Sequence, residues 1–345
     1  MTGVRIPYLD GRAGQPAALE RVAARVAAQL AALGTEGGVL ASAVRPVFVG
    51  IGASYAALAL PVALLAEGGI PARRELAGEI GTGLAFTGAD LVLGVSQSGR
   101  SAETLQSLAL PAGGPRAAVV NVAPSLLSQA VEQCVDLGNE PDSYASTIGY
   151  TGTLVALTMV ARTLLGTPAA EAAREWAGIG AELERHEAAL APVVDEVARL
   201  AAGVVAADVV ASGAFRAVSE SGALLLREVC RVPASALVTR NYLHGEMESA
   251  GDTLHVIIGD GRELELAGTL AAAGHRTLCV TSAALAPAEH LHVVPLPAAA
   301  PLPVRTVLAA AVLQRLAGAL AGTRGVEIED FVFHNSDTKI EETAA

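Results

Sequence analysis

The sequence predicts an α/β fold built from two parallel sheets, each covered by helices on both faces. Short strands rich in Val, Leu and Ile alternate with Ala-rich helices along most of the 345 residues. Such apolar runs are typical of strands buried in a parallel sheet. The pattern restarts halfway along the chain, and a chain of this length has room for two domains.

In the first half, residues 1–14 are expected to form a loose arm, and residues 16–33 an amphipathic helix. The predicted strands cover residues 46–52, 91–96 and 117–122. The first of them leads into an apolar helix over residues 54–67, and the second into a helix that begins near Ser101. Residues 168–203 are charged and predict one long linker helix, broken near Pro192.

In the second half, strands are predicted over residues 208–212, 253–259, 276–281 and 292–297, and helices over residues 215–229 and 304–320. We therefore expect an N-terminal arm and helix over 1–44, a first domain over 45–166, a linker helix over 167–206 and a second domain with a C-terminal catalytic tail over 207–345.

The restart is an internal repeat. Residues 47–67 align without gaps on residues 208–228, so that Gly52 meets Gly213 and Glu67 meets Glu228. Residues 91–96 align on residues 254–259. The copies then differ, because Ser96-Gln-Ser-Gly99 follows the strand in the first and Gly259-Asp-Gly-Arg262 in the second. Hydroxyls suit an anion and a carboxylate does not, so an anion-binding cup is expected only in the first copy.

Composition excludes several classes of function. Hydrophobic residues make up 52% and charged residues 17%, so a large core is expected and disorder is not. The net charge of −12, with no run of Lys or Arg, disfavours nucleic acid and membrane surfaces as partners. Three scattered cysteines, no C-x-x-C and no signal peptide pattern predict a cytoplasmic protein.

The segment from Ser96 to Thr104 joins a buried strand to a helix N-terminus. A phosphate there would meet free N–H groups, the positive end of the helix dipole and the hydroxyls of Ser96, Ser98, Ser101 and Thr104. The carboxyl end of a strand is also where open α/β sheets bind ligands. The alternative is a turn in which Ser101 and Thr104 only cap the helix.

Other motifs argue against cofactor chemistry. Gly50-Ile-Gly-Ala-Ser-Tyr55 lacks the third glycine of a dinucleotide loop, and Ser96 is not in a G-x-S-x-G elbow. We therefore expect no nicotinamide cofactor and no serine hydrolase, and Ser54 is either a helix cap or a ligand-binding hydroxyl. His290 and His292 share one side of a strand, but they lack further partners, so no metal site is expected.

Three more residues are candidates for chemistry. Glu228 ends an otherwise apolar helix, and His244 lies in the loop that follows. An isolated Glu at a helix end is usually solvated, and an isolated His usually has a structural role. Lys339 is the only lysine of the chain. Unlike Arg, a lysine can lose its proton and act as a nucleophile or base. The alternative is that this single lysine is present by chance in a lysine-poor sequence and has no functional role.

Together these motifs resemble the sugar isomerase (SIS) family. The segment 96–104, preceded by Gly52-Ala-Ser-Tyr55, is similar to the phosphosugar-binding motif of SIS domains, and the likeness extends over about residues 45–345. It includes Ala145-Ser-Thr147, the helix ending at Glu228, His244-Gly245 and the tail with Lys339. The resemblance implies two flavodoxin-like parallel sheets in tandem SIS domains, as in the isomerase half of glucosamine-6-phosphate synthase and in free-standing aminosugar-phosphate deaminases and fructosamine-6-phosphate deglycases.

The resemblance also implies roles. The phosphate-binding residues would be Ser54, Ser96, Gln97, Ser98 and Ser101, with further substrate contacts from Gly52, Ala53, Thr104 and Ser146. Glu228 would be the base that moves a proton between C1 and C2 of the sugar. His244 would assist ring opening from across the interface of a homodimer, and Lys339 would form an imine with the open-chain ketose.

The departures from the family pattern narrow the expected reaction. There is no N-terminal glutaminase domain, and Leu225 stands where the synthase has a lysine three residues before its base. We therefore expect an aminosugar-phosphate deaminase or a fructosamine-phosphate deglycase. A simple aldose–ketose phosphosugar isomerase and a non-catalytic sugar-phosphate-binding regulator remain as alternatives. The sequence does not name the sugar.

Overall fold

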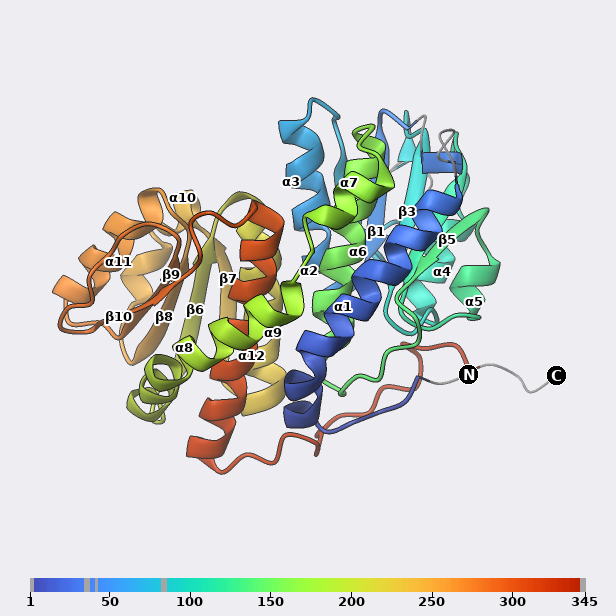
Figure 1. Cartoon of the computed structure of the whole chain (residues 1–345). Coiled ribbons are helices and arrows are strands. Elements are labelled where there is room, and N and C mark those ends of the chain that lie inside the picture. The colour runs from blue at the N-terminus through green and yellow to red at the C-terminus, as the bar shows by residue number, and fades with distance from the viewer. Residues whose placement is uncertain (1–2, 34–37, 41–42, 82–85, 342–345) are drawn as a thin grey trace. The chain divides into compact units, whose positions relative to one another are not determined.

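The computed structural model of the chain describes residues 3–33, 38–40, 43–81 and 86–341 (Figure 1). The chain forms two compact units. The first runs up to Gly180 and also includes the tail from Val332 onward; the second is Ala181–Phe331. The tail that the sequence assigned to the second domain therefore packs with the first unit.

The first unit contains a sheet of five parallel strands in the order β2-β1-β3-β4-β5. The strands are β1 (Pro46–Gly50), β2 (Arg73–Leu76), β3 (Leu91–Ser96), β4 (Arg116–Val120) and β5 (Gln133–Asp136). This is the flavodoxin-like order, in which the chain reverses direction between β1 and β3 and leaves a ligand crevice at their carboxyl ends.

Helices cover both faces of this sheet. They are α1 (Tyr8–Ala32), α2 (Ala53–Ala57), α3 (Ala59–Glu67), α4 (Ala102–Ala109), α5 (Leu126–Gln129), α6 (Ile148–Leu164) and α7 (Ala169–Arg174), with a 3₁₀ turn at Gly38–Leu40. On one face, Leu108 of α4 and Leu127 of α5 pack on Val49 and Val92. Helix α6 packs against α1 and α3.

One expectation for this unit is wrong, and one helix was missed. Residues 1–14 are not a loose arm beyond Pro7, because α1 begins at Tyr8 and continues through Pro16. The buried side chains of Tyr8 and Leu19 hold both halves of α1 in place, and this packing outweighs the backbone hydrogen bond that Pro16 cannot make. Helix α6 was not predicted at all. It is buried nearly all round, so it lacks an amphipathic pattern.

The second unit repeats the same sheet. Its five parallel strands lie in the order β10-β9-β8-β6-β7, which is the order of the first sheet read from the other edge. The strands are β6 (Ala206–Ala211), β7 (Ala234–Val238), β8 (Thr253–Ile258), β9 (Thr277–Thr281) and β10 (Leu291–Pro295).

The helices of this unit are α8 (Ile179–Leu200), α9 (Arg216–Cys230), α10 (Thr239–Tyr242), α11 (Arg262–Ala272) and α12 (Leu302–Arg324), with 3₁₀ turns at Gly213–Phe215 and Glu246–Ser249. Helices α9 and α12 pack together, while α10 and α11 join the core of the other face. The predicted break near Pro192 is wrong, because α8 continues through it and the chain instead breaks at residues 175–178.

The internal repeat is confirmed at the level of the fold. In each unit the first strand runs into a helix through a glycine with the same left-handed backbone, Gly52 with φ of 58° and Gly213 with φ of 58°. An L side chain rarely adopts this conformation, which explains why glycine stands at both positions.

Helix α12 is long and apolar enough, by length and composition alone, to cross a bilayer. However, 83% of its most apolar window is buried inside the protein. Its side chains Val307, Leu313 and Leu316 are fully or almost fully buried. Within the described residues it is therefore the core helix of the second unit.

Candidate functional site

The turn after β3 forms a cup of hydroxyl groups. Ser96 is buried, and its Oγ lies 2.9 Å from the Oγ of Ser101. The Oγ of Ser98 accepts a hydrogen bond of 3.3 Å from the backbone N–H of Arg100. Gly99 adopts a φ of 64°, and a side chain there would collide with Ser125. Glycine at this position therefore allows the chain to fold tightly around the cup.

The first turn of α4 leaves donors available at this cup. Ser101 is the N-cap residue, but its side chain bonds to Ser96 and does not cap the helix. Among the described residues, the N–H groups of Glu103 and Thr104 have no acceptor and the fully buried Oγ1 of Thr104 has no partner. Donors in such a place are normally satisfied by a ligand or by water. The alternative in which the side chain of Ser101 caps the helix is therefore wrong.

The C-terminal tail lies directly against the same turn. Lys339 forms an antiparallel bridge with Ser101. The N–H of Ala102 donates to the carbonyl of Thr338 over 3.2 Å, and the N–H of Ile340 donates to the carbonyl of Arg100 over 3.0 Å. This short pairing brings the only lysine of the chain, which is more than 200 residues away in sequence, to the edge of the cup.

The surroundings of Lys339 favour its neutral amine. Its pKa is lowered, first by partial desolvation and then by the positive charges of Arg5 and Arg100. The side chain as a whole remains exposed, so desolvation is only partial. Arg5 is held nearby because its guanidinium stacks 4.3 Å over the ring of Tyr144 and its backbone bridges to Asp142.

Two further segments border the cup. The turn Gly52-Ala53-Ser54 follows β1, which pairs with β3, so it lies at the same reversal point of the sheet. On another side, a Cβ built on Gly149 would lie 3.0 Å from both Gln97 and Ser146, so these two side chains are neighbours.

Ser146 is oriented by a buried carboxylate. Its hydroxyl donates over 2.6 Å to Asp142, which also accepts from the N–H and the hydroxyl of Thr147. Burial raises the pKa of Asp142, and these hydrogen bonds oppose the rise. The structure thus gathers all the predicted phosphate-binding residues along the carboxyl end of the first sheet.

Glu228 and His244 belong to the second unit. Glu228 lies in the last turn of α9 and is half-buried; desolvation raises its pKa from 4.5 to about 7. His244 follows α10 and is exposed, and its N–H donates to the carbonyl of Asn241 over 2.9 Å. Helix α9 runs antiparallel to the strands, so Glu228 lies at the amino end of β7 whereas His244 lies beyond its carboxyl end.

Neither a family model nor a curated protein matches the sequence of this chain. Solved structures do match its fold. The C-terminal domain of glucosamine-fructose-6-phosphate aminotransferase from Francisella tularensis matches with a TM-score of 0.78 at 21% identity, over 93% of this chain and 96% of that one. Tagatose-6-phosphate ketose/aldose isomerase from Escherichia coli matches with a TM-score of 0.74 at 15% identity, over 91% and 92%. Glucosamine-6-phosphate deaminase from Thermotoga maritima matches with a TM-score of 0.70 at 16% identity, over 96% and 99%.

The chain has the tandem SIS fold. The matches cover both units, and these structural neighbours are a domain of an aminotransferase, a ketose/aldose isomerase and a deaminase. At these identities the likeness establishes the architecture that the sequence predicted.

In this SIS fold, Arg227 does not replace the missing lysine at position 225. Its Nε donates over 2.8 Å to the carbonyl of Ala234, where it ties α9 to the start of β7. Leu225 is buried in the packing of α9. The last turn of α9 therefore offers one carboxylic acid for proton transfer, Glu228.

In the second unit, the turn that corresponds to the cup is occupied by a carboxylate of the protein itself. Asp260, which follows β8, accepts hydrogen bonds from the hydroxyls of Thr281 and Ser282 and forms an ion pair of 2.6 Å with Arg305. Burial acts to raise the pKa of Asp260, but these bonds and the Arg305 charge outweigh it, so its pKa is lowered. This ionised carboxylate would repel a phosphate, which fits the expectation that only the first copy has an anion cup.

Sequence reasoning missed the buried network that anchors the His244 loop. The hydroxyl of Tyr242 donates to Asp208 over 2.9 Å. Because this hydroxyl has one proton, it must accept from the Nδ1–H of His255, which lies 2.9 Å away. Burial lowers the pKa of His255 to about 4, so its ring is neutral. An Asp inside an apolar strand was the available signal, because such a residue is rarely buried without a partner.

We predict that Tyr242→Phe lowers the free energy of unfolding by about 1–3 kcal/mol, because it leaves Asp208 and His255 buried without their shared partner. Urea denaturation measures this value. Tyr55→Phe is the matched control, since it keeps the ring that Arg74 stacks on, and it should change stability by less than about 0.5 kcal/mol. Equal effects of the two variants would show that the network does not anchor the loop.

Proposed function

We propose that this protein is an enzyme that processes a ketose or aminosugar 6-phosphate, as an aminosugar-phosphate deaminase or a fructosamine-phosphate deglycase. The observation that carries the proposal is the pairing of the tail with the cup, which places the only lysine beside Ser101. A lysine beside an anion-binding turn suits a substrate that carries both a phosphate and a carbonyl group.

In this proposal the cup binds the phosphate of the substrate. Its oxygens would accept hydrogen bonds from the free N–H groups of α4 and from the hydroxyls of Ser96, Ser98 and Ser101. The phosphate is remote from the reacting carbons, so its binding energy serves to orient them. Ser54, Gln97 and Ser146 border the same space and would complete the substrate contacts.

Glu228 would move the proton between C1 and C2. With a pKa of about 7 its carboxyl group exists in both protonation states near neutral pH. It can therefore remove a proton from one carbon and return it to the next, which is the property that a general acid–base residue needs. A positioned group of this kind contributes about 10²–10⁴-fold to the rate.

Lys339 would form an imine at C2 of the open-chain sugar. In a deaminase, Glu228 would first move the proton of C2 to C1 of the open-chain aminosugar, which leaves a C=N bond at C2. The amine of Lys339 would add to this carbon and displace ammonia, and water would then hydrolyse the lysine imine to the ketose and the free amine. In a deglycase, the proton would move from C1 to C2, and water would hydrolyse the resulting C=N bond at C1 and release the amine without a covalent bond to Lys339.

We further propose that His244 acts in a homodimer. Glu228 and His244 lie at opposite ends of β7, whose four residue steps span roughly 13 Å. Because the two residues lie at opposite ends of this strand, a site that uses both is better completed by His244 from a second copy. A cytoplasmic location fits the three unpaired cysteines.

Two other functions remain as outcomes of the test. A simple aldose–ketose isomerase would use Glu228 in the same way and release no amine. A regulator would bind the sugar phosphate without turnover. Purified protein should therefore be incubated with aminosugar 6-phosphates, fructosamine 6-phosphates and ketose 6-phosphates. Release of ammonia or an amino acid supports the proposal, aldose–ketose exchange alone identifies an isomerase, and binding without turnover identifies a regulator.

The cup is tested by changing Ser96 and Ser98 together to Ala. Each lost hydrogen bond to a charged group should cost about 1.5–3 kcal/mol, so fructose 6-phosphate should bind at least about tenfold more weakly by calorimetry. Ser128→Ala, in the neighbouring α5, is the control and should leave binding unchanged. Unchanged affinity in the double variant would place the phosphate elsewhere.

Glu228→Gln should lower kcat by on the order of 10²-fold with little change in KM. In the wild type, kcat should rise with pH through about 7, where the carboxyl group loses its proton. The unfolded chain loses this proton near pH 4.5, so the buried carboxyl costs stability as pH rises from 4.5 to 7. The variant lacks this cost and should be at least as stable at pH 8.

Glu67→Gln is the control for Glu228, because Glu67 occupies the matching position of the repeat and is exposed. It should change neither kcat nor its pH dependence. Full turnover by Glu228→Gln would exclude Glu228 as the base, and a loss of stability at pH 8 would indicate a structural role.

Lys339 is tested by reduction with borohydride in the presence of fructose 6-phosphate. An imine would be trapped, and because the chain has one lysine, intact mass and a peptide map distinguish Lys339 from the N-terminus. Lys339→Arg keeps the charge but cannot form an imine, so it should abolish trapping and lower kcat by on the order of 10²-fold or more. Full activity of Lys339→Arg would exclude an imine intermediate. The reaction would then proceed through an enediol, with Glu228 as the base.

A further inference from the structure

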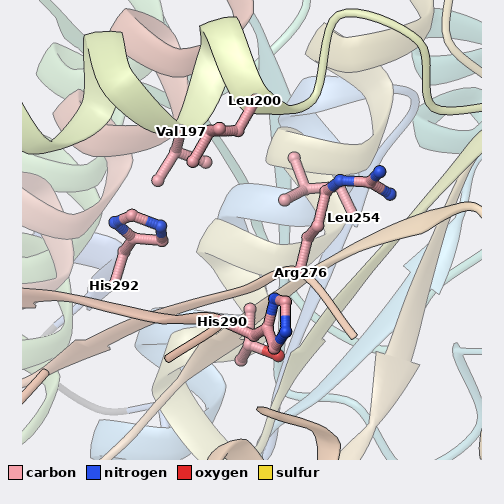
Figure 2. Close-up of a pocket in the computed structure, with 7 residues that line it drawn as sticks. Val197, Leu200, Leu254, Arg276, His290 and His292 are labelled. Carbon is pink, nitrogen blue, oxygen red and sulfur yellow. The ribbon is translucent and has the colours of Figure 1, made fainter. Parts of the chain in front are cut away.

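A cavity of about 230 Å³ opens at the amino ends of β8, β9 and β10, against the last turns of α8. Figure 2 shows the imidazoles of His290 and His292 and the side chain of Arg276 around this hollow, with Val197 and Leu200 on the helix above it. We propose that it is a second ligand site of this protein, which binds a small organic anion with an apolar body.

The cavity is separate from Glu228. In the second sheet, β6 and β8 lie between β7, where α9 ends, and β9, where Arg276 and Thr277 begin the next strand. Three strand spacings separate β7 from β9, which is roughly 14 Å. The cavity also lies at the opposite end of the strands from the His244 loop. A ligand bound here therefore lies apart from the groups proposed for catalysis.

The polar side of the cavity carries a cationic group and N–H donors. Within the protein these groups have only weak interactions with acidic side chains. Arg276 lies 3.9 Å from Asp252, and the side chain of that aspartate is 78% exposed. His290 lies 3.7 Å from Glu289, whose side chain is 90% exposed. Exposed pairs at such distances contribute little to stability. An anion in the cavity could therefore accept hydrogen bonds from the guanidinium group of Arg276 and from the two imidazoles. No strong ion pair inside the protein would have to break.

These groups are held on a rigid frame. The N–H of Thr277 donates to the carbonyl of His290 over 2.9 Å, which fixes the chain just before β10. His292 pairs in register with Leu278 of β9. His290 also has a left-handed backbone with φ of 62°, which few residues other than glycine adopt. The backbone that carries these donors is therefore fixed, and only their side chains lose freedom on binding.

The apolar side chains of the cavity determine that the rest of the ligand, beyond its anionic head, is apolar. Leu254 and Val197 are buried at its base, while Leu200 is 46% exposed at its rim. A ligand with an apolar body would cover Leu200 while its anionic head faces Arg276. The volume corresponds to on the order of eight water molecules, which suits a benzoate-sized anion.

The test uses protein with isotope-labelled Leu and Val methyl groups, because Val197, Leu200 and Leu254 are themselves the reporters. Benzoate is titrated by NMR against benzyl alcohol, which keeps the ring without the charge, and phenyl phosphate, which changes the head. Benzoate or phenyl phosphate should shift these three methyl signals in a saturable way, and benzyl alcohol should bind at least about tenfold more weakly. The comparison of benzoate with phenyl phosphate identifies the head that the site prefers.

Arg276→Met should weaken binding at least about tenfold, and His292→Gln should weaken it as an independent variant. Arg185→Met is the matched control, since Arg185 is exposed near the other end of α8, and it should change nothing. The shifts should persist when Ser96 and Ser98 are changed to Ala, so this result does not depend on the proposed function. Equal binding of benzyl alcohol, an unaffected Arg276→Met variant or shifts confined to other methyl groups would each overturn the proposal.

Discussion

The need to satisfy polar groups at the carboxyl ends of buried strands governs both units of this protein. Wherever a parallel strand turns into a helix, the first N–H groups of that helix lack partners within it. In the second unit the turn after β8 carries the carboxylate of Asp260, which already accepts from Thr281, Ser282 and Arg305. The N–H of Gly261, at the start of the next helix, donates to Glu263. In the first unit the side chains at this turn are hydroxyls, and among the described residues the N–H groups of Glu103 and Thr104 in α4 have no acceptor. The same fold thus has one turn closed by its own carboxylate and one turn with open donors.

The sequence was most informative about central strands. β1, β3, β6, β8 and β9 are apolar and bounded by turn residues, so their patterns predicted them. The strands β2, β5 and β7 were not predicted, because all three are edge strands and β2 and β5 are also short and partly charged. Edge strands keep such residues to avoid pairing with other chains, and this weakens their signal. Proline misled the prediction of helices at Pro16 and Pro192, where tertiary packing outweighs the lost hydrogen bond.

The candidate site was predictable where it is local and unpredictable where it depends on distant contacts. The hydroxyl cup lies within six residues, Ser96 to Ser101, so its composition and place after a strand identified it. The contact of Lys339 with Ser101 is backbone pairing between a tail and a turn far away in sequence, for which periodicity gives no signal. The Tyr242 network depends on β6 and β8 lying side by side with Asp208 opposite His255, which only the register of the sheet defines.

The two glutamates of the repeat show how burial, and not residue type, creates a reactive group. Glu67 and Glu228 end equivalent helices after equivalent strands, and the alignment of the copies cannot tell them apart. Glu67 is exposed, as a carboxylate at a helix end usually is. Glu228 is half-buried, and this loss of water alone raises its pKa to about 7. A difference in packing around two equivalent helix ends therefore gives one solvated carboxylate, Glu67, and one candidate base, Glu228.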